Sequence, residues 1–371
     1  MSTAVAPLKL AFVFGTRPEA IKLAPIIVAA QARPAEFEVV VISTGQHREM
    51  LDQMLKWFVI DATVDLAVMR PDQTITFITS AVLGGVGAHF ERSRPDWVIV
   101  HGDTTTTFAA ALAAFYQRLP VAHVEAGLRT GDIYSPYPEE MNRLLTTRLT
   151  SLHLAPTGAA RSNLLAEGVP DDRIVVTGNP GIDALMLTLA KLTPPAGPEP
   201  GAARNLLVTM HRRENHGAPM GGICRALLDL LDRYPDLTVT LPLHLSPRVR
   251  EIVLPLLGEH PRVDLCEPLA YPQFVAAMAR ATLILSDSGG VQEEAPSLGK
   301  PVLVLRDMTE RPEAVAAGAA VIVGADRELI VSVAARLLDD RDAYAQMATV
   351  INPFGDGTAA QQILAALVDH C

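Results

Sequence analysis

The stretch WVIVHGDTTTTFAAALAAFYQRLPVAHVEAGLRTGDIYSPYPEEMNR, residues 97–143, decides the fold of this chain. It begins with the apolar run Trp97–Val100, and a second apolar run, Val121–Val124, follows. Short aliphatic runs of this kind are typical of strands that are buried in a parallel sheet. The stretch therefore predicts an α/β protein.

Acidic residues stand just after both predicted strands. Asp103 follows the first run, and Glu125 follows the second. In an open α/β sheet, ligands bind outside the carboxyl ends of the strands. The proline-rich loop that comes next carries two more acids, Glu139 and Glu140. Because two neighbouring strands place acids at this edge, the stretch predicts an acid–base site.

The same pattern extends along the chain and repeats once. An apolar strand at Lys9–Phe14 opens the first half, and the pattern restarts at Leu206–Thr209. Between them, the proline- and glycine-rich segment Lys191–Arg204 indicates an exposed connection. Strands that alternate with helical patterns form parallel sheets of βαβ units. Further strands are expected at 38–43 and near 97, 121, 152 and 174 in the first half, and near 239, 263, 283, 302 and 321 in the second.

The two halves predict two doubly wound, Rossmann-like domains with a cleft between them. We expect residues 1–177 and 355–371 to form the domain that carries the acids, and residues 178–354 to form the other. The C-terminus is assigned to the first domain because Gly357–Val368 has a helical pattern that suits packing back across it.

Composition narrows the range of functions. The 371 residues are 49% hydrophobic, so the chain can bury a large core, and at about 100–200 residues per domain two domains are expected. The net charge of −10 and the isoelectric point near 5.5 disfavour nucleic acid or an anionic membrane as the main partner. Three widely spaced cysteines form neither a disulfide framework nor a zinc pattern. The sequence shows no signal peptide or membrane-spanning run, which predicts a cytoplasmic protein.

The motif SDSGGVQEEAPSLGKP follows an apolar strand and opens a helix. Ser288, Gly289 and Gly290 offer backbone N–H groups and a hydroxyl to phosphate oxygens. Glu293 and Glu294 lie one turn further on, where a carboxylate can accept hydrogen bonds from two ribose hydroxyls. We interpret the motif as a nucleotide site, although not as a dinucleotide site, because GxGxxG is absent. The alternative is a glycine turn before a solvated acidic helix start, which the helix dipole alone favours.

Positive side chains follow the first strand of each half. Arg17 and, one helical turn on, Lys22 do so in the first half, and Arg212 and Arg213 do so in the second. If both halves are doubly wound, these groups face the predicted cleft, where they suit a diphosphate. For any one of them, the alternative is an ordinary surface charge.

Three histidines, His47, His211 and His244, stand at the ends of predicted strands. His101 and His123 lie within or at the end of strands, and we interpret them as core histidines bonded to the backbone. No pair of histidines has the spacing of metal ligands, so we expect no metal. The sequence also lacks the GxSxG motif of serine hydrolases.

Several long motifs resemble those of the non-hydrolysing UDP-N-acetylglucosamine 2-epimerases. They are GTRPEAIKLAPI, TGQHREML, the stretch from HGDTTTT to PYPEEMNR, HRREN, SDSGGVQEEAPSLGKPVLVLRDMTERPEA and NPFGDG, and they extend from Leu10 to Val368. The resemblance implies a GT-B-like fold and reversible conversion of UDP-N-acetylglucosamine to UDP-N-acetylmannosamine, supplying N-acetylmannosamine units for cell-surface polysaccharide. It also implies a homodimer, no metal and no nicotinamide cofactor.

The resemblance assigns roles to individual residues. The acid–base carboxylates are Asp103, Glu125 and Glu139, while His211 lies against the diphosphate, with Arg17 and Lys22 beside the site. The remaining substrate-binding residues are Phe274, near the uracil, and Ser288, Gly289, Gly290 and Glu294 of the UDP-binding loop. A second substrate molecule acts as an activator at or near Gln46, Arg48, Glu49, Glu140, Arg213 and His244.

Departures from the family pattern are few. Many members read GNTVID where this chain has GNPGID, with Pro180 and Gly181, and Met210 precedes His211 where a small residue is common. Neither change removes a predicted catalytic group.

The residues also suit the chemistry that the resemblance implies. The hydrogen on C2 of the sugar is not next to a carbonyl, so a base alone cannot remove it. Transient oxidation at C3 needs NAD, for which the sequence has no fingerprint. The other route eliminates UDP to give 2-acetamidoglucal, returns a proton to the opposite face, and adds UDP again. It needs a base, an acid and neutralisation of the departing diphosphate; we expect Asp103 to serve one face and Glu125 or Glu139 the other.

Three other classes of protein remain possible at this point. A GT-B glycosyltransferase shares the fold but does not need three acids in one lobe. A sugar-nucleotide sensor binds without turnover, which the intact acids and His211 disfavour. A hydrolysing epimerase releases free N-acetylmannosamine and UDP. A modified UDP-sugar also remains possible as the true substrate.

Overall fold

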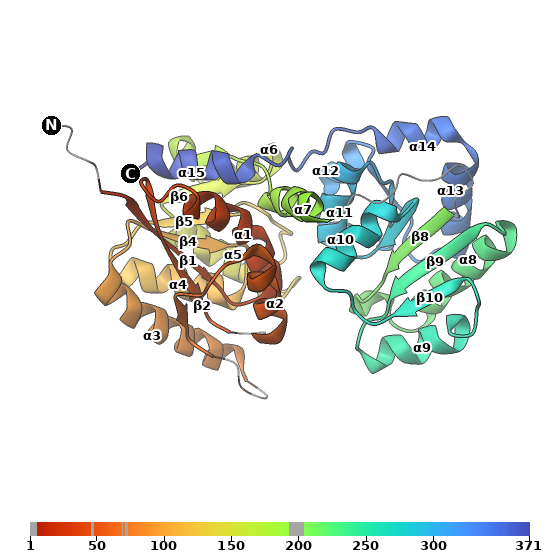
Figure 1. Ribbon diagram of the computed structural model, residues 1–371, viewed down its shortest axis with the longest axis horizontal. Helices are drawn as coiled ribbons and strands as arrows, with labels where there is room; N and C mark the ends of the chain where they lie inside the picture. Colours follow the sequence, from red (N-terminus) through yellow and green to blue (C-terminus); the bar gives the residue numbers. More distant parts are fainter. Residues whose placement is uncertain (1–5, 46–47, 69, 71–72, 193–203) are drawn as a thin grey trace. The chain divides into compact units, whose positions relative to one another are not determined.

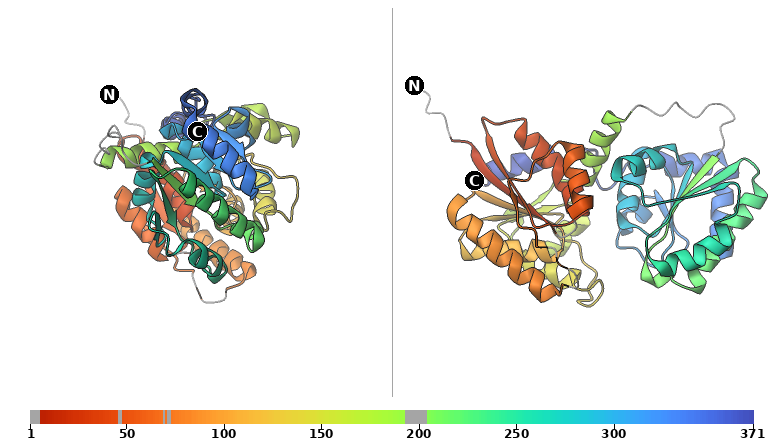
Figure 2. Two further views of the ribbon diagram at one scale, coloured as in Figure 1. Left: turned by 90° about the vertical axis from the view of Figure 1, so that its right-hand side faces the viewer. Right: turned by 60° about the horizontal axis from the view of Figure 1, so that its bottom comes forward.

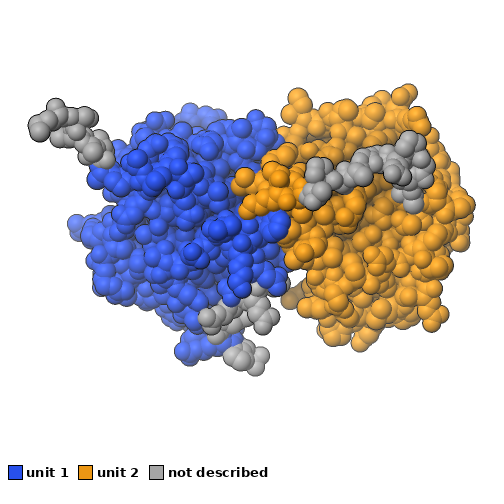
Figure 3. All heavy atoms as spheres, in the orientation of Figure 1, with its two compact units in different colours: residues 1–184, 354–371 blue, residues 185–353 orange. Residues whose placement is uncertain are grey.

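The computed structural model describes residues 6–45, 48–68, 70, 73–192 and 204–371. The chain divides into two compact units, which Figure 3 shows in different colours. Unit 1 is Met1–Ala184 together with Phe354–Cys371, and unit 2 is Leu185–Pro353. Most of the predicted connection at Lys191–Arg204 lies outside the described residues.

Unit 1 is built on a parallel sheet of seven strands in the order β3-β2-β1-β4-β5-β6-β7 (Figure 1). Its strands are β1 (Leu8–Phe14), β2 (Phe37–Ser43), β3 (Val64–Asp65), β4 (Trp97–His101), β5 (Val121–Val124), β6 (Leu152–Ala155) and β7 (Ile174–Val176). Its helices are α1 (Arg17–Gln31), α2 (Arg48–Phe58), α3 (Ile75–Ser93), α4 (Thr105–Tyr116), α5 (Glu139–Leu149), α6 (Gly158–Ala166), the 3₁₀ turn η1 (Asp171–Arg173) and α15 (Ala359–Asp369). The boundary with unit 2 falls within α7 (Pro180–Lys191).

Unit 2 is built on a second parallel sheet, of six strands in the order β10-β9-β8-β11-β12-β13. Its strands are β8 (Arg204–Thr209), β9 (Leu237–Pro242), β10 (Val263–Cys266), β11 (Leu283–Ser286), β12 (Val302–Val304) and β13 (Ala320–Ile322). Its further helices are η2 (Arg213–Asn215), α8 (Ala218–Arg233), α9 (Pro247–Leu257), α10 (Tyr271–Arg280), α11 (Gly289–Glu294), η3 (Ala295–Leu298), α12 (Pro312–Ala316), α13 (Arg327–Asp339) and α14 (Arg341–Ala348).

Every strand that the apolar runs predict is present. β4 and β5 are buried along their whole length, as expected for strands with helices on both faces of the sheet (Figure 2). One strand of unit 1, β3, was not predicted. It has two residues and no apolar run, so its sequence carries no strand signal.

The C-terminal helix packs in unit 1. α15 lies beside α1 (Figure 1), and Ile363, Leu364 and Leu367 on its inner face are fully buried. The indole Nε1 of Trp97, at the start of β4, donates a hydrogen bond of 3.1 Å to the carbonyl oxygen of Leu367. Among the described residues, no helix combines the length and the apolar character that crossing a membrane requires.

The strand orders locate the place in each unit where a ligand is expected. β1 is paired with both β2 and β4, and β8 is paired with both β9 and β11. The strand order reverses at these pairs, and α/β proteins bind ligands outside the carboxyl ends of the strands at such a switch point. The loops that follow β1 and β4, and those that follow β8 and β11, are therefore the candidate site segments of units 1 and 2.

Candidate active site

Asp103 lies in the loop between β4 and α4, at the switch point of unit 1. Gly102, with a φ of 65°, turns the chain out of the strand, and glycine adopts this left-handed conformation without steric penalty. The guanidinium of Arg143 donates a 2.7 Å hydrogen bond to Oδ2 of Asp103, and Asn142 donates one of 2.9 Å to its backbone carbonyl. The first turns of α5 therefore hold Asp103 by both its side chain and its main chain.

The electrostatic surroundings of Asp103 favour its protonated form. Burial raises the pKa of Asp103 to about 6, and although Arg143 opposes the rise, the negative charges of Glu125 and Glu139 add to it. A carboxyl group with such a pKa exchanges its proton readily near neutral pH. All three predicted acid–base carboxylates belong to unit 1.

Glu125 follows β5 and is held in a strained conformation. Its φ is 62°, a left-handed conformation that costs a non-glycine residue about 1 kcal/mol or more. Its carboxylate forms an ion pair with the ammonium of Lys22 and accepts a 3.0 Å hydrogen bond from Nδ2 of Asn179. The imidazole Nε2 of His101 lies 3.6 Å from the same oxygen. Backbone strain of this kind is concentrated at functional sites, where the surrounding contacts maintain it.

The two strand histidines differ in their partners. Nε2 of His123 lies 2.7 Å from the carbonyl oxygen of Gly102, which confirms a core histidine bonded to the backbone. His101 is equally buried, yet neither of its ring nitrogens has a hydrogen-bond partner among the described residues. It faces Glu125 instead, so its interpretation as a backbone-bonded histidine was wrong.

The two acids at the start of α5 have different surroundings. Glu139 is half-buried, and within the described part of the chain its Oε2 has no hydrogen-bond partner. The side chain of Glu140 is 1% exposed and accepts hydrogen bonds of 3.1 Å from the backbone N–H groups of Thr130 and Gly131. It also lies 3.4 Å from the guanidinium of Arg143. Glu140 therefore anchors the loop before α5, and its predicted part in an activator site stays a prediction.

Sequence reasoning did not identify a buried acid that joins the two candidate loops of unit 1. Glu19 accepts hydrogen bonds from the backbone N–H groups of Gly15 and Thr16 at 3.1 and 2.8 Å, and from the hydroxyls of Thr104 and Thr107 at 2.7 and 3.1 Å. The loop after β1 is thereby tied to the loop after β4. Arg17, the first residue of α1, follows directly on the first of these loops.

The site segments of unit 2 are joined in a similar way by Asp287, which follows β11. Its Oδ2 accepts hydrogen bonds from the backbone N–H groups of His211 and Arg212 at 2.7 and 2.8 Å, and from Nδ2 of Asn215 at 3.2 Å. Its Oδ1 lies 2.9 Å from Nδ1 of the His211 ring. The ring of His244 stacks on that of His211, with centroids 5.8 Å apart and an angle of 24° between the planes.

The predicted UDP-binding loop lies directly after Asp287. The N–H of Ser288 donates a 3.0 Å hydrogen bond to the hydroxyl of Ser286, so this N–H is not open to a phosphate, in contrast to the prediction. Gly289 and Gly290 open α11, a helix of only six residues. A methyl group at Gly289 would lie 3.7 Å from the guanidinium carbon of Arg311, which places an unpredicted positive charge beside the loop.

The remaining predicted residues lie at the following positions. Glu294 is 9% exposed at the end of α11, and Phe274 is half-buried on α10. Arg213 is exposed in η2. Arg48 and Glu49 begin α2. Gln46 and His47 lie outside the described residues.

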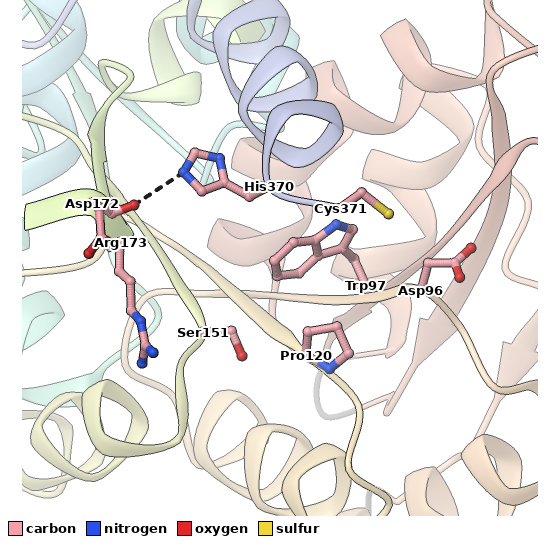
Figure 4. Close-up of a pocket in the computed structure, with 8 residues that line it drawn as sticks. All are labelled: Asp96, Trp97, Pro120, Ser151, Asp172, Arg173, His370 and Cys371. Atoms are coloured by element: carbon pink, nitrogen blue, oxygen red, sulfur yellow. Dashed lines mark hydrogen bonds between the residues drawn. The ribbon is translucent and has the colours of Figure 1, made fainter. Parts of the chain in front are cut away.

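A hollow of about 480 Å³ lies on unit 1, away from the candidate residues of that unit (Figure 4). Trp97, Ser151 and Arg173, which help to line it, stand at or just before the starts of β4, β6 and β7. The hollow is therefore at the amino ends of the strands, whereas the candidate residues are at the carboxyl ends. No described group of three or more His, Cys, Asp or Glu side chains is arranged to hold a metal ion.

Known proteins resemble this chain over nearly its whole length. The family model described as UDP-N-acetylglucosamine 2-epimerase matches residues 29–368. The UDP-N-acetylglucosamine 2-epimerase of Escherichia coli (strain K12) is 51% identical over 376 residues, which cover 98% of this chain and 99% of that protein.

Solved structures agree with this assignment. The crystal structure of UDP-GlcNAc 2-epimerase from Neisseria meningitidis, bound to UDP-GlcNAc, is 48% identical with a TM-score of 0.90, covering 98% of this chain and 100% of that one. The glycotransferase of kitacinnamycin, at 14% identity and a TM-score of 0.64, covers 97% of this chain and 99% of its own and shares the fold alone. The predicted fold of two Rossmann-like, GT-B-like domains is confirmed, and the chain belongs to the UDP-N-acetylglucosamine 2-epimerase family of isomerases.

Proposed function

We propose that this protein interconverts UDP-N-acetylglucosamine and UDP-N-acetylmannosamine by elimination and re-addition of UDP. The observation that carries the proposal is the group of three carboxylates in unit 1, of which Asp103 has a pKa raised to about 6. A base removes the C2 proton, the C2–H electron pair forms the C1–C2 double bond, and the C1–O bond breaks to release UDP. A proton then returns to the other face of C2, and UDP adds again at C1.

The surroundings of the carboxylates suggest how they divide this work. Asp103 serves one face of C2, because its raised pKa suits a group that alternately holds and releases a proton. Glu125 or Glu139 serves the other face. The ion pair with Lys22 favours the charged form of Glu125, which suits a group that begins the reaction as a base. Glu139 lacks such a cation among its described contacts.

The departing diphosphate needs positive charge and hydrogen-bond donors. We assign this role to His211 of unit 2 and to Arg17 and Lys22 of unit 1. Gly289 and Gly290 contribute N–H groups at the start of α11, and the Ser288 side chain contributes a hydroxyl. Arg311, which forms an ion pair with Glu293, lies beside them. Glu294 holds the ribose hydroxyls, and Phe274 lies near the uracil. No nicotinamide cofactor or metal takes part in the elimination route.

The test follows the C2 hydrogen. The protein is incubated with UDP-N-acetylglucosamine in deuterated water without added NAD or metal, and the products are followed by NMR. We expect the C2 epimer, with one solvent deuterium at C2. A product that keeps the original hydrogen would overturn the elimination route. Free N-acetylmannosamine as the product would instead indicate a hydrolysing epimerase, and the absence of any epimer would contradict the proposed activity.

We also propose that a second UDP-N-acetylglucosamine molecule activates the enzyme, that the enzyme is a homodimer, and that the product supplies cell-surface polysaccharide. The activator contacts are Gln46, Arg48, Glu49, Glu140, Arg213 and His244. A reaction started from UDP-N-acetylmannosamine alone should then show a lag that a trace of UDP-N-acetylglucosamine abolishes. Arg213→Ala should remove this activation more than it weakens UDP binding, whereas a full initial rate without the trace would exclude the activator.

A further inference from the structure

Asp287 is a buried carboxylate that has no role in the reaction as proposed above. Its side chain is 0% exposed, and it follows β11 at the switch point of the unit 2 sheet. The three hydrogen bonds to its Oδ2 all come from the segment that follows β8. These bonds fix the main chain of His211 relative to the start of the UDP-binding loop.

The other carboxylate oxygen faces a ring nitrogen. Oδ1 is buried and lies 2.9 Å from Nδ1 of His211, and within the described part of the chain no group donates a hydrogen bond of regular geometry to it. Burial alone would raise the pKa of Asp287, but the contact with His211 and the backbone N–H groups outweigh burial and hold that pKa below its usual value. Asp287 is therefore a carboxylate, and at 2.9 Å its negative charge favours a proton on the nitrogen that Oδ1 faces.

A second histidine packs against the His211 ring and restricts its orientation. His244 covers one face of the ring. Nδ1 of His244 accepts a 3.1 Å hydrogen bond from the N–H of Ser246, which orients the stacked ring in turn. The side chain of His211 is 39% exposed, and no described residue forms a hydrogen bond with its Nε2. Nε2 is thus the edge of the ring that is open to a ligand.

We propose that Asp287 is a positioning residue that holds a proton on Nδ1 of His211 and directs Nε2 toward the departing diphosphate. The inference rests on the proposed role of His211. When a phosphate oxygen also accepts a hydrogen bond from Nε2, both ring nitrogens carry protons, and the ring is an imidazolium placed between two anions. Because the charge of Asp287 is fixed and excluded from water, the positive ring requires little rearrangement as UDP leaves.

The first variant is Asp287→Asn. An asparagine can still accept hydrogen bonds from the segment after β8 through its oxygen, but it then presents an NH₂ group to Nδ1 of His211. That nitrogen becomes an acceptor, and the ring loses its charge. We expect kcat to fall at least about tenfold and KM for UDP-N-acetylglucosamine to change less, because the residues that bind the uridine are unaltered.

The direct readout is ¹⁵N NMR of the full-length protein with labelled histidine and bound UDP, with the His211 signals assigned from His211→Gln. In the wild type, both nitrogens of His211 should carry protons. In Asp287→Asn, only Nε2 of His211 should carry a proton. An unprotonated Nδ1 in the wild type would overturn the proposal without any Asp287 variant, so the test stands even if Asp287→Asn fails to fold.

Asp183→Asn is the matched control for a purely structural effect. Asp183 is also a buried aspartate, and it accepts backbone hydrogen bonds from Ala359 and Ala360 at 3.2 and 2.9 Å in unit 1. Its replacement should lower the melting temperature while the His211 signals stay unchanged. If Asp183→Asn alters those signals as Asp287→Asn does, the readout reports stability, and the proposal fails.

A double-mutant cycle separates this inference from the proposed function. If Asp287 acts through His211, Asp287→Asn should add less than about a twofold loss of kcat in a His211→Gln background. If Asp287→Asn lowers kcat by the same factor in the His211→Gln background as in the wild type, the positioning role is contradicted. If the wild type epimerises and Asp287→Asn retains its full kcat, the inference fails while the proposed function stands. If the wild type forms no epimer, the proposed function fails, and the NMR result still decides the state of the ring.

Discussion

At the scale of single residues, a positively charged side chain contacts each of two candidate acids. Asp103 and Glu125 each have a cation as a direct partner, Arg143 and Lys22 respectively. Asp103 nevertheless has its pKa raised to about 6, because burial outweighs the arginine. The two acids thus have different surroundings, and acids with different surroundings are what the proposed acid–base work requires.

The raised pKa of Asp103 predicts how its replacement alters stability. The folded protein holds a proton on Asp103 up to a pKa of about 6, above the ordinary value of 3.8, so its contribution to stability is full below pH 4 and is lost as the pH rises through 6. The asparagine that replaces it in Asp103→Asn does not titrate. The free energy of unfolding of this variant, relative to wild type, should therefore increase between pH 4 and pH 8 by at most about 3 kcal/mol.

Urea unfolding at both pH values measures this difference. The control is Asp356→Asn, because hydrogen bonds from Thr358 lower the pKa of the exposed Asp356 below its usual value despite some opposing desolvation. That carboxylate stabilises the protein above its unfolded pKa and loses the effect as the pH falls. Its replacement should therefore lower the relative free energy of unfolding as the pH rises through the range below 4, which is the opposite sign, and change it little between pH 4 and pH 8. Parallel curves for wild type and Asp103→Asn would contradict the raised pKa.

The proposed acids also predict kinetic losses. Asp103→Asn, Glu125→Gln and Glu139→Gln should each keep the fold and lower kcat by at least about 10²-fold, the usual effect of losing a general acid or base. Glu36→Gln, which removes an exposed carboxylate paired with Arg33, should leave the rate unchanged. Steady-state rates in both directions test this. A variant of the three with a normal kcat would have no acid–base role.

The proposed contact between Glu294 and the ribose predicts a loss of UDP affinity. Glu294→Ala should weaken UDP binding by roughly 1.5–3 kcal/mol, the usual effect of losing a charge-assisted hydrogen bond. Isothermal titration calorimetry with UDP measures the change, and Glu310→Ala, which alters a partly exposed acid next to Arg306, is the control. Normal UDP binding by Glu294→Ala would show that this acid only supports the start of its own helix.

At the scale of elements, apolar runs predicted the strands and the acids at their ends, because burial and strand length are local properties of the sequence. The partners of these acids were not predictable in the same way. Arg143 lies 40 residues from Asp103, and Asn179 lies 54 residues from Glu125. Which side chains meet across such distances depends on helix packing and strand register, and no pattern within one segment specifies it.

The helix α15 offers a test of how an element far along the chain supports the unit 1 sheet. Ile363 is fully buried there, so Ile363→Ala removes apolar contacts and should lower the free energy of unfolding by about 2–5 kcal/mol. Gln361→Ala, on the exposed face of the same helix, should change it by less than about 0.5 kcal/mol. Equal effects in urea unfolding would mean that α15 does not pack as described.

At the scale of the whole molecule, each unit has its own hydrophobic core. One core surrounds β8, β9 and β11 in unit 2, and another lies around β1, β4 and α4 in unit 1. Cores that share no residues give each unit its own stability. The two-domain organisation was predictable because the strand pattern restarts after a proline- and glycine-rich segment. The helical pattern of Gly357–Val368 suggested that the last residues return to the first unit, but no local pattern specifies which side chains they contact there.

Separate cores predict a localised response to a core substitution. Leu227 is fully buried in the unit 2 core, so Leu227→Ala should lower the protection of β8, β9 and α8 against hydrogen exchange. β1, β4 and α4 of unit 1 should keep their protection. Exchange followed by mass spectrometry resolves these peptides, and Val100→Ala in unit 1 is the reciprocal control. Uniform loss of protection over both units would mean that the protein opens only as a whole.

The hydrogen bond from Trp97 to Leu367 has a consequence for how the protein is made, because its two ends are 270 residues apart. On the ribosome, the residues of the first sheet emerge early, but α15, which covers it, is translated only after Leu185–Pro353. At about 5–20 residues per second, this interval lasts roughly ten to thirty seconds. During that time the apolar residues that pack on α15 lack their cover, so unit 1 is complete only after the segment that follows unit 2 has been made.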